Sequence, residues 1–172
     1  MRATPTAGFT LVELLIVVAI IASLAAIAIP SYLRARIAAN EAAAIADTRT
    51  LISAETAYHS AASGSGYGSM FCLLTPVDPT CLGGAASTQG FIDSSMASLA
   101  PRAGYNRTFV GEPAGASTGL ACFVYNALPV VPGHTGVRGF AGDCSGKLCF
   151  TPDGSLVPQA NGALDPACAQ LR

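Results

Sequence analysis

The chain has 172 residues, a formal net charge of −1, and 11% charged against 51% hydrophobic side chains. This length fits one domain with an extension. The nine Lys and Arg are scattered along the chain, so the composition gives no support for a direct nucleic-acid-binding site. The hydrophobic residues gather near the N-terminus, whereas the last two thirds are rich in Gly, Ser, Thr and Pro.

Residues 9–29 form an almost continuous run of Leu, Ile, Val and Ala. As an α-helix they would extend about 31 Å, which matches the hydrocarbon thickness of a bilayer. A secretory signal peptide would have a shorter apolar core, followed by a cleavage site of small residues. Residues 25–28 are similar to such a site, but the apolar run before them is longer. An ordinary membrane anchor would leave the Glu13 carboxylate, alone among apolar residues, without a partner.

The sequence GFTLVELLI at residues 8–16 resembles the cleavage and assembly motif of type IV pilins and the related pseudopilins. In that family a membrane-embedded prepilin peptidase cuts after the Gly and methylates the new N-terminal amine. The resemblance therefore implies a leader peptide of residues 1–8, Gly8 and Phe9 as the processing site, and N-methylation of Phe9. The mature chain would have 164 residues (172 − 8), and residues 9–30 would form the transmembrane and filament-core helix. It covers about residues 8–33, and the rest of the chain is similar to the family only in layout.

Elementary chemistry agrees with this motif. Gly8 has no side chain to obstruct an extended fit into a protease cleft. Cleavage would turn the Phe9 nitrogen into a cation, and Glu13 of the same or a neighbouring subunit could pair with it. Inside a filament such a carboxylate needs a partner, so Glu13, with Thr10 of the same motif, is expected to set the subunit register. At Pro30 we expect a kink, or a stretch that melts on assembly, rather than a helix end.

The resemblance also implies location, partners and function. The precursor would lie in the inner membrane, in contact with its lipids, with the head outside the cytoplasm. An inner-membrane assembly platform would then polymerise it into a helical homopolymer, the extracellular pilus, for adhesion, twitching motility or DNA uptake. The alternatives are a pseudopilin of a type II secretion system, or a minor pilin. Major pseudopilins typically carry acidic Ca²⁺ ligands and few cysteines, which favours a pilin here.

Residues 31–62 continue the helix as an amphipathic segment. Its apolar positions recur at spacings of seven and one, and they are Ile37, Ala44, Ile45, Leu51, Ile52 and Tyr58. This stripe is expected to cover a sheet. Glu41 and Glu55 lie near its edge, where we expect solvated or intersubunit surface charges.

The sequence after residue 62 predicts a connecting region followed by an antiparallel sheet. Residues 63–104 begin with a Gly/Ser breaker and include a possible short helix at 91–99. The sheet is expected within residues 105–157, and residues 158–172 are expected to form an irregular tail pinned by a disulfide. The predicted strands are residues 105–110, 120–127, 137–141 and 147–151, and a weaker one at 155–157. The fold class is therefore α+β: a long N-terminal helix whose second half packs on an antiparallel sheet.

Six cysteines in a turn-rich, exported domain predict three disulfides. They are Cys72, Cys81, Cys122, Cys144, Cys149 and Cys168. Fifteen pairings are possible, and the favoured set joins Cys72 to Cys81, Cys144 to Cys149 across a Ser145-Gly146 hairpin turn, and Cys122 to Cys168. A metal site would need closely spaced Cys or Cys/His pairs, and none is present.

No catalytic residues, cofactor or metal are expected, so the chain is predicted not to be an enzyme. The segment 115–119 matches the Gly-x-Ser-x-Gly sequence pattern of a nucleophile elbow. That motif needs a helix after it, but a strand-like run follows here. His59 is expected to fill space at the helix–sheet contact or to lie at the surface, and residues 133–136 are expected to form a turn. Asn106 heads a glycosylation-type triplet inside a predicted strand, which is a poor context for modification.

Overall fold

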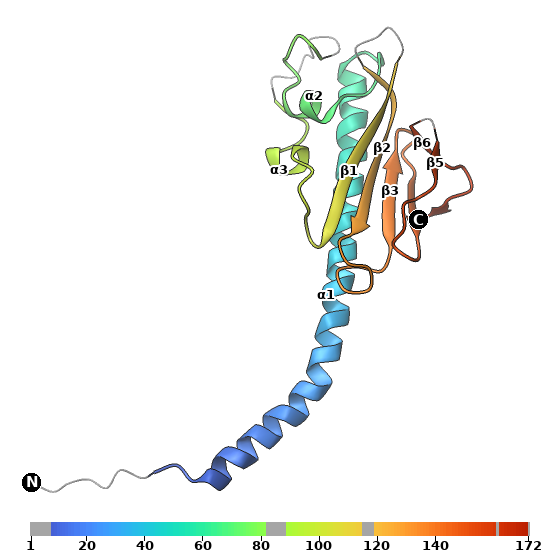
Figure 1. Cartoon of the computed structure of the whole chain (residues 1–172). Helices are drawn as coiled ribbons and strands as arrows, with labels where there is room; N and C mark the ends of the chain where they lie inside the picture. The colour runs from blue at the N-terminus through green and yellow to red at the C-terminus, as the bar shows by residue number, and fades with distance from the viewer. Residues whose placement is uncertain (1–7, 82–88, 115–118, 161, 172) are drawn as a thin grey trace, which may run out of the picture. The chain divides into compact units, whose positions relative to one another are not determined.

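The computed structural model describes residues 8–81, 89–114, 119–160 and 162–171. It contains two compact units, Met1–Arg36 and Ile37–Arg172, and the second is called the head here. Helix α1 (Leu11–Ala61) contributes to both units, and all other elements belong to the head (Figure 1). The leader up to residue 7, and most of the elbow-like segment 115–119, lie outside the described residues.

Helix α1 passes through Pro30 without ending, as the strong helix formers on both sides of it predict. Within the head one stripe of the helix is buried at alternating spacings of three and four, which is the pattern of one helix face. The buried residues are Glu41, Ala44, Thr48, Leu51, Ala54, Glu55 and Tyr58. The predicted stripe is thus correct at Ala44, Leu51 and Tyr58, while Ile37, Ile45 and Ile52 are only half-buried.

The expectation that Glu41 and Glu55 are surface charges is wrong. Both belong to the buried stripe, with relative exposures of 7% and 0%. A buried carboxylate requires hydrogen-bond donors or protonation. The donors to Glu41 are Val137 and Arg138, far along the chain, and the donor to Glu55 is the Gly68 N–H in the loop after the helix. Helix periodicity alone therefore could not place the two carboxylates.

The head contains a five-stranded antiparallel sheet in the order β1-β2-β3-β4-β7. The strands are β1 (Tyr105–Pro113), β2 (Leu120–Pro129), β3 (Gly139–Asp143), β4 (Leu148–Thr151) and β7 (Ala169–Gln170). The first four correspond to the four firm sequence predictions, and together with α1 they confirm the predicted α+β fold. Ser145 and Gly146 form the turn between β3 and β4, where Gly146 takes a φ of 78°.

One face of the sheet packs on the head half of α1 (Figure 1). Tyr125, Phe140 and Leu148 on this face join Leu51 and Tyr58 of the helix in one buried cluster. The helix comes very close to β3 at Gly142. A Cβ atom there would lie 2.7 Å from both Thr48 Cγ2 and Ile52 Cδ1, so a side chain at this position would have to displace these two helix side chains.

The opposite face of the sheet is covered by the C-terminal tail. Val124, Ala141 and Cys149 point to this face and pack against Val157 and Leu164. The tail forms a small hairpin, β5 (Gln159–Ala160) with β6 (Ala163–Leu164), and then adds β7 to the sheet edge beside β4. The prediction of an irregular tail is therefore wrong for these elements, and residues 155–157 are not a strand.

Between helix and sheet the chain forms two short helices, α2 (Met70–Leu74) and α3 (Ser94–Ala97). Ser69 caps α2 by accepting from the Cys72 N–H, and Asp93 caps α3 by accepting from the Met96 N–H. The first helix was not predicted, and the second falls inside the predicted 91–99 segment. Residues 82–88 of this region lie outside the described residues.

The structure has three disulfides, and two of the favoured pairings are wrong. Cys72 joins Cys81 as predicted, but Cys122 joins Cys144, and Cys149 joins Cys168. Strand register gives the reason: Cys149 lies opposite Ala141, whereas the Cys144 N–H donates to Phe123 O and so lies beside β2. Cys168 does pin the tail, but it does so through β4.

Candidate processing and assembly site

The residues after the candidate cleavage position form a reciprocal cap at the start of α1. Thr10 Oγ1 accepts a hydrogen bond from the Glu13 N–H at 3.2 Å. Glu13 Oε2 in turn accepts from the Thr10 N–H at 3.0 Å and from the Thr10 hydroxyl at 2.7 Å. This is a capping box, in which a Thr before the helix and a Glu three residues later satisfy each other's backbone donors.

The capping box gives Glu13 a role that the sequence analysis missed. The Thr-x-x-Glu spacing at the start of an apolar helix was the signal that could have revealed it. In the uncut chain the carboxylate therefore already has donors from its own helix. The positive end of the helix dipole also stabilises a carboxylate at this position.

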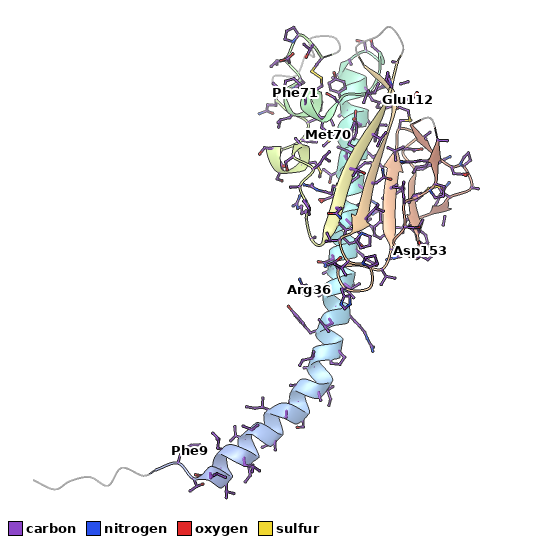
Figure 2. The ribbon with its side chains drawn as sticks, viewed as in Figure 1. Phe9, Arg36, Met70, Phe71, Glu112 and Asp153 are labelled. Atoms are coloured by element: carbon purple, nitrogen blue, oxygen red, sulfur yellow. A yellow bond between two sulfur atoms is a disulfide. The ribbon has the colours of Figure 1, made fainter. Side chains whose placement is uncertain are left out.

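The first half of α1 exposes almost all of its apolar side chains. In Figure 2 the side chains between the labelled Phe9 and Arg36 point outward around the helix, and Phe9 is 75% exposed. The large exposed residues of this segment are Leu11, Val12, Leu14, Leu15, Ile16, Val17, Val18, Ile20, Ile21, Leu24, Ile27, Ile29, Tyr32 and Leu33. By length and composition α1 could cross a membrane. An apolar helix exposed on every side needs lipid or other helices around it.

In the head, Glu41 ties the helix to the start of β3. Its Oε1 accepts from the N–H groups of Val137 and Arg138 at 3.0 and 3.1 Å. Its Oε2 accepts from Arg138 Nε at 2.9 Å and from Nη2 at 2.7 Å. Burial opposes ionisation of Glu41, but these donors and the guanidinium charge outweigh it, so its pKa lies below the ordinary value.

Glu55 has a different environment, because no ion pair involves it within the described part of the chain. Its Oε2 accepts from the Gly68 N–H at 2.9 Å, and its Oε1 is buried without a hydrogen-bond partner among the described residues. Burial raises the pKa of Glu55 to about 8, against the opposing effect of the Gly68 N–H. The side chain is therefore protonated at neutral pH and holds the Gly/Ser breaker onto the helix.

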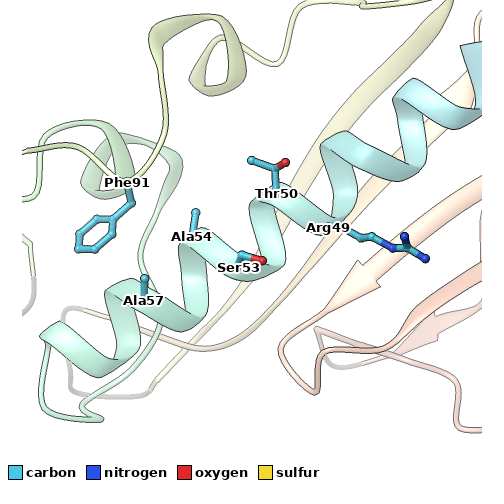
Figure 3. A pocket seen from close by; sticks show the side chains of 6 residues that line it. All are labelled: Arg49, Thr50, Ser53, Ala54, Ala57 and Phe91. Carbon is cyan, nitrogen blue, oxygen red and sulfur yellow. The ribbon is translucent and has the colours of Figure 1, made fainter. Parts of the chain in front are cut away.

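An open groove of about 470 Å³ runs along the outer side of α1 in the head (Figure 3). Its floor consists of small helix residues, and Phe91 forms one wall. The lining residues are Arg49, Thr50, Ser53, Ala54, Ala57 and Phe91. Small side chains at spacings of three and four let another helix come close to this surface.

Neither histidine forms part of a reactive cluster in the described residues. His59 stacks on Tyr67, with ring centroids 4.8 Å apart, and so fills space at the helix end as expected. His134 lies in the predicted turn, where its N–H donates to Val131 O. Across the described part of the chain, no group of three or more His, Cys, Asp or Glu is close enough to hold a metal ion.

Comparison with known proteins gives one match. Residues 5–29 match the family model of the prokaryotic N-terminal methylation motif. The match includes Gly8, Phe9, Thr10 and Glu13, and it ends one residue before Pro30. No curated protein and no solved structure matches the chain.

Proposed function

We propose that this chain, which carries the hallmark motif of type IV pilin and pseudopilin precursors, is a structural subunit of a type IV pilus. Prepilin peptidase cuts it after Gly8 and methylates Phe9. An inner-membrane assembly platform then moves the subunit from the membrane into a helical filament outside the cell. The heads face outward in that filament, where they serve adhesion, twitching motility or DNA uptake.

The observation that carries this proposal is the exposed apolar half of α1 with one acidic residue at its start. Lipid can cover this surface in the precursor, and neighbouring copies of the same helix can cover it in a filament. Within the head, the groove lined by Arg49 and Ala57 offers a separate surface of small side chains. Both surfaces suit packing of helices side by side.

The capping box suggests how Glu13 changes partners on assembly. Before cleavage its carboxylate accepts from the Thr10 N–H and hydroxyl. Cleavage creates a positively charged amine at Phe9, and a charged donor binds a carboxylate more strongly than a neutral one. In the water-free filament core, the carboxylate of a misplaced subunit would lack this amine, so correct register is favoured.

Three disulfides in the head favour a pilin over a secretion pseudopilin. Cys72–Cys81 closes a local loop, Cys122–Cys144 links two strands, and Cys149–Cys168 ties the tail to the sheet. Such cross-links form in oxidising compartments outside the cytoplasm, and the periplasm is one of them. Their number is what favours a pilin, because major pseudopilins typically have few cysteines.

The test is shear recovery of filaments from cells that express the wild-type chain, Glu13→Val, or the control Ser23→Val. Ser23 donates only to Ile20 O of its own helix, so its replacement leaves the cap intact. We expect long filaments from the wild type and from the control, and cleaved protein without filaments from Glu13→Val. Filaments at normal yield from Glu13→Val would contradict the proposal, and short periplasmic filaments alone would favour the pseudopilin.

A further inference from the structure

Strand β1 forms one edge of the sheet, and part of that edge is open (Figure 1). The start of the edge is covered, because Tyr105 exchanges backbone hydrogen bonds with Arg102, and the Arg107 side chain donates to carbonyl groups of the preceding loop. Beyond this point β2 is the only described strand that pairs with β1. No described loop hydrogen-bonds to the backbone of residues 109–111. This segment is called the open edge here.

The backbone groups of Phe109 and Gly111 point away from the sheet. In an antiparallel pair, successive residues bond alternately to the partner strand and to the opposite side. The N–H and C=O of Tyr105 both bond to Arg102 on the outer side, so the odd-numbered residues of β1 face outward. The register stays regular up to Glu112. Phe109 and Gly111 therefore each offer one N–H and one C=O to a further strand.

The open edge lacks the features that usually prevent sheets from pairing edge to edge. Such features are charged side chains, proline, bulges and a covering segment. Here the bulge, with Glu112 and Pro113, comes only after the open edge has ended. The exposed side chain within the segment is that of Val110, at 47%. An edge of this kind favours the addition of a strand from another chain.

Strand β7 is the opposite edge of the same sheet. The Leu171 N–H donates to Leu148 O of β4, so by alternation the N–H and C=O of Gln170 point away from β4. Both residues of β7 are exposed. Four antiparallel pairings separate β1 from β7, so the two edge strands run in the same direction. A β7 strand that continued the sheet beside β1 of another copy would therefore be parallel to it.

One parallel register matches the free backbone groups of both edges. In a parallel pair, an outward residue donates to the residue before its neighbour and accepts from the residue after it. With Gln170 beside Val110, the Gln170 N–H meets Phe109 O, and the Gln170 C=O meets the Gly111 N–H. These two bonds use groups that have no partner strand within one described chain.

The side chains fit the same register. Leu171 and Phe109 both pack against the buried cluster between the sheet and α1, so the helix-facing sides of the two strands coincide. Two positions beyond Gln170 and Val110, the sequence has Arg172 and the exposed Glu112. Opposite charges at neighbouring positions of adjacent strands are favourable, and they select this register over a shifted one.

From this match we propose that β7 of one subunit pairs with the open edge of the next, which extends one sheet across neighbouring heads. The inference rests on the proposed function, because the apolar half of α1 must first bring the copies together. Two backbone hydrogen bonds are weak alone, but a filament raises the local concentration of the two edges. A head-to-tail contact can repeat along an open helical polymer, whereas β1 paired with β1 would close a two-fold dimer.

Cysteine cross-linking in assembled filaments tests this pairing. The double variant Val110→Cys with Gln170→Cys is expressed, and its sheared filaments are treated with a short bismaleimide and separated under reducing conditions. The native cysteines are all paired, so the introduced thiols are the ones that react. The matched control keeps Val110→Cys and adds Ala160→Cys, at an exposed position of the tail hairpin away from the sheet edge.

We expect a ladder of covalent dimers, trimers and longer multimers from the double variant. Each single variant and the control pair are expected to remain monomeric. Adding Glu112→Arg to the double variant should lower the cross-linked fraction, because two like charges then lie side by side. If the double variant does not assemble, filaments formed from a mixture of the two single variants carry the test, and a covalent dimer is then the expected product.

Three results would overturn the inference while leaving the filament itself intact. The first is wild-type filament yield without cross-linking in the double variant or in the mixture. The second is dimer formation by Val110→Cys alone, which means that β1 pairs with β1. The third is an equal ladder from the control pair, which means that the contact is not specific to β7. Absence of filaments from the wild type would overturn both the proposed function and the pairing.

Discussion

Glu41 and Arg138, 97 positions apart in the chain, join α1 to the sheet through two hydrogen bonds of 2.9 and 2.7 Å that converge on one carboxylate oxygen. The other oxygen of the same carboxylate accepts from the backbone N–H groups of Val137 and Arg138, just before β3. The guanidinium lies over the rings of Phe140 and Phe150, 5.4 and 5.7 Å from their centroids. One helix residue therefore fixes the end of the sheet at which β3 begins.

Replacing Glu41 by Ala is expected to lower the free energy of unfolding by about 1–3 kcal/mol, because a partly buried guanidinium and two N–H groups lose their acceptor. Urea denaturation of the purified full-length chain in detergent, followed by circular dichroism, measures this change. Glu112→Ala, at an exposed position of β1, is the matched control and should change the stability little. Equal stability of the two variants would show that the Glu41 contacts do not hold the head together.

Glu55 predicts an unusual pH dependence of stability. Its pKa is raised from 4.5 to about 8 in the folded chain, so between these values the folded state binds a proton that the unfolded state has released. Its contribution to stability is then full below pH 4.5 and declines as the pH rises to about 8, by at most about 1.4 kcal/mol per pH unit. Glu55→Gln should remove this decline, whereas Glu112→Gln should keep it. Parallel curves for the wild type and Glu55→Gln would rule out a protonated Glu55.

Thr10 and Glu13 allow the cap to be separated from the charge. Glu13→Gln keeps a side chain that can complete the capping box but cannot form an ion pair with the Phe9 amine. Thr10→Ala removes the hydroxyl and keeps the carboxylate. We expect Thr10→Ala to reduce the yield of sheared filaments moderately and Glu13→Gln to abolish it, as measured by immunoblot of the sheared and membrane fractions. The reverse order would mean that helix capping, and not charge pairing, controls assembly.

The disulfide between Cys149 and Cys168 is expected to hold the tail on the sheet. Replacing both residues by Ser should cost about 3 kcal/mol, which is typical of a loop of this length, and should expose residues 158–171 to a nonspecific protease. The pair Cys72→Ser and Cys81→Ser is the control, because it opens a loop away from the tail. Mass spectrometry of unreduced peptides tests the pairing itself, and a peptide that links Cys122 to Cys168 would contradict the structure.

The sequence predicted those parts of the fold that follow from local patterns. Residues 9–29 are apolar on all sides of a helix. The four firmly predicted strands are short strand-like runs that Gly or Pro clusters separate, so both element types were evident. The T-x-x-E spacing at Thr10 and Glu13 also carried enough information to predict the cap. Local pattern was sufficient here because the interactions involved span only a few residues.

The errors concern partners that lie far apart in the chain. Glu41 looked like a surface residue because its partner, Arg138, is 97 positions away. Cys149 was assigned to the wrong partner because hairpin proximity was considered without register, and register points its side chain toward the tail. The short strands of the tail have too few residues to show a period, and they form because the sheet gives them a surface to cover.

Intact-mass and N-terminal peptide analysis of the protein in sheared surface filaments tests the proposed processing and assembly most directly. We expect a subunit that begins with N-methylated Phe9 and contains the three disulfides within one chain. Filaments built from subunits that retain Met1–Gly8, or filaments in which this chain is absent, would contradict this expectation.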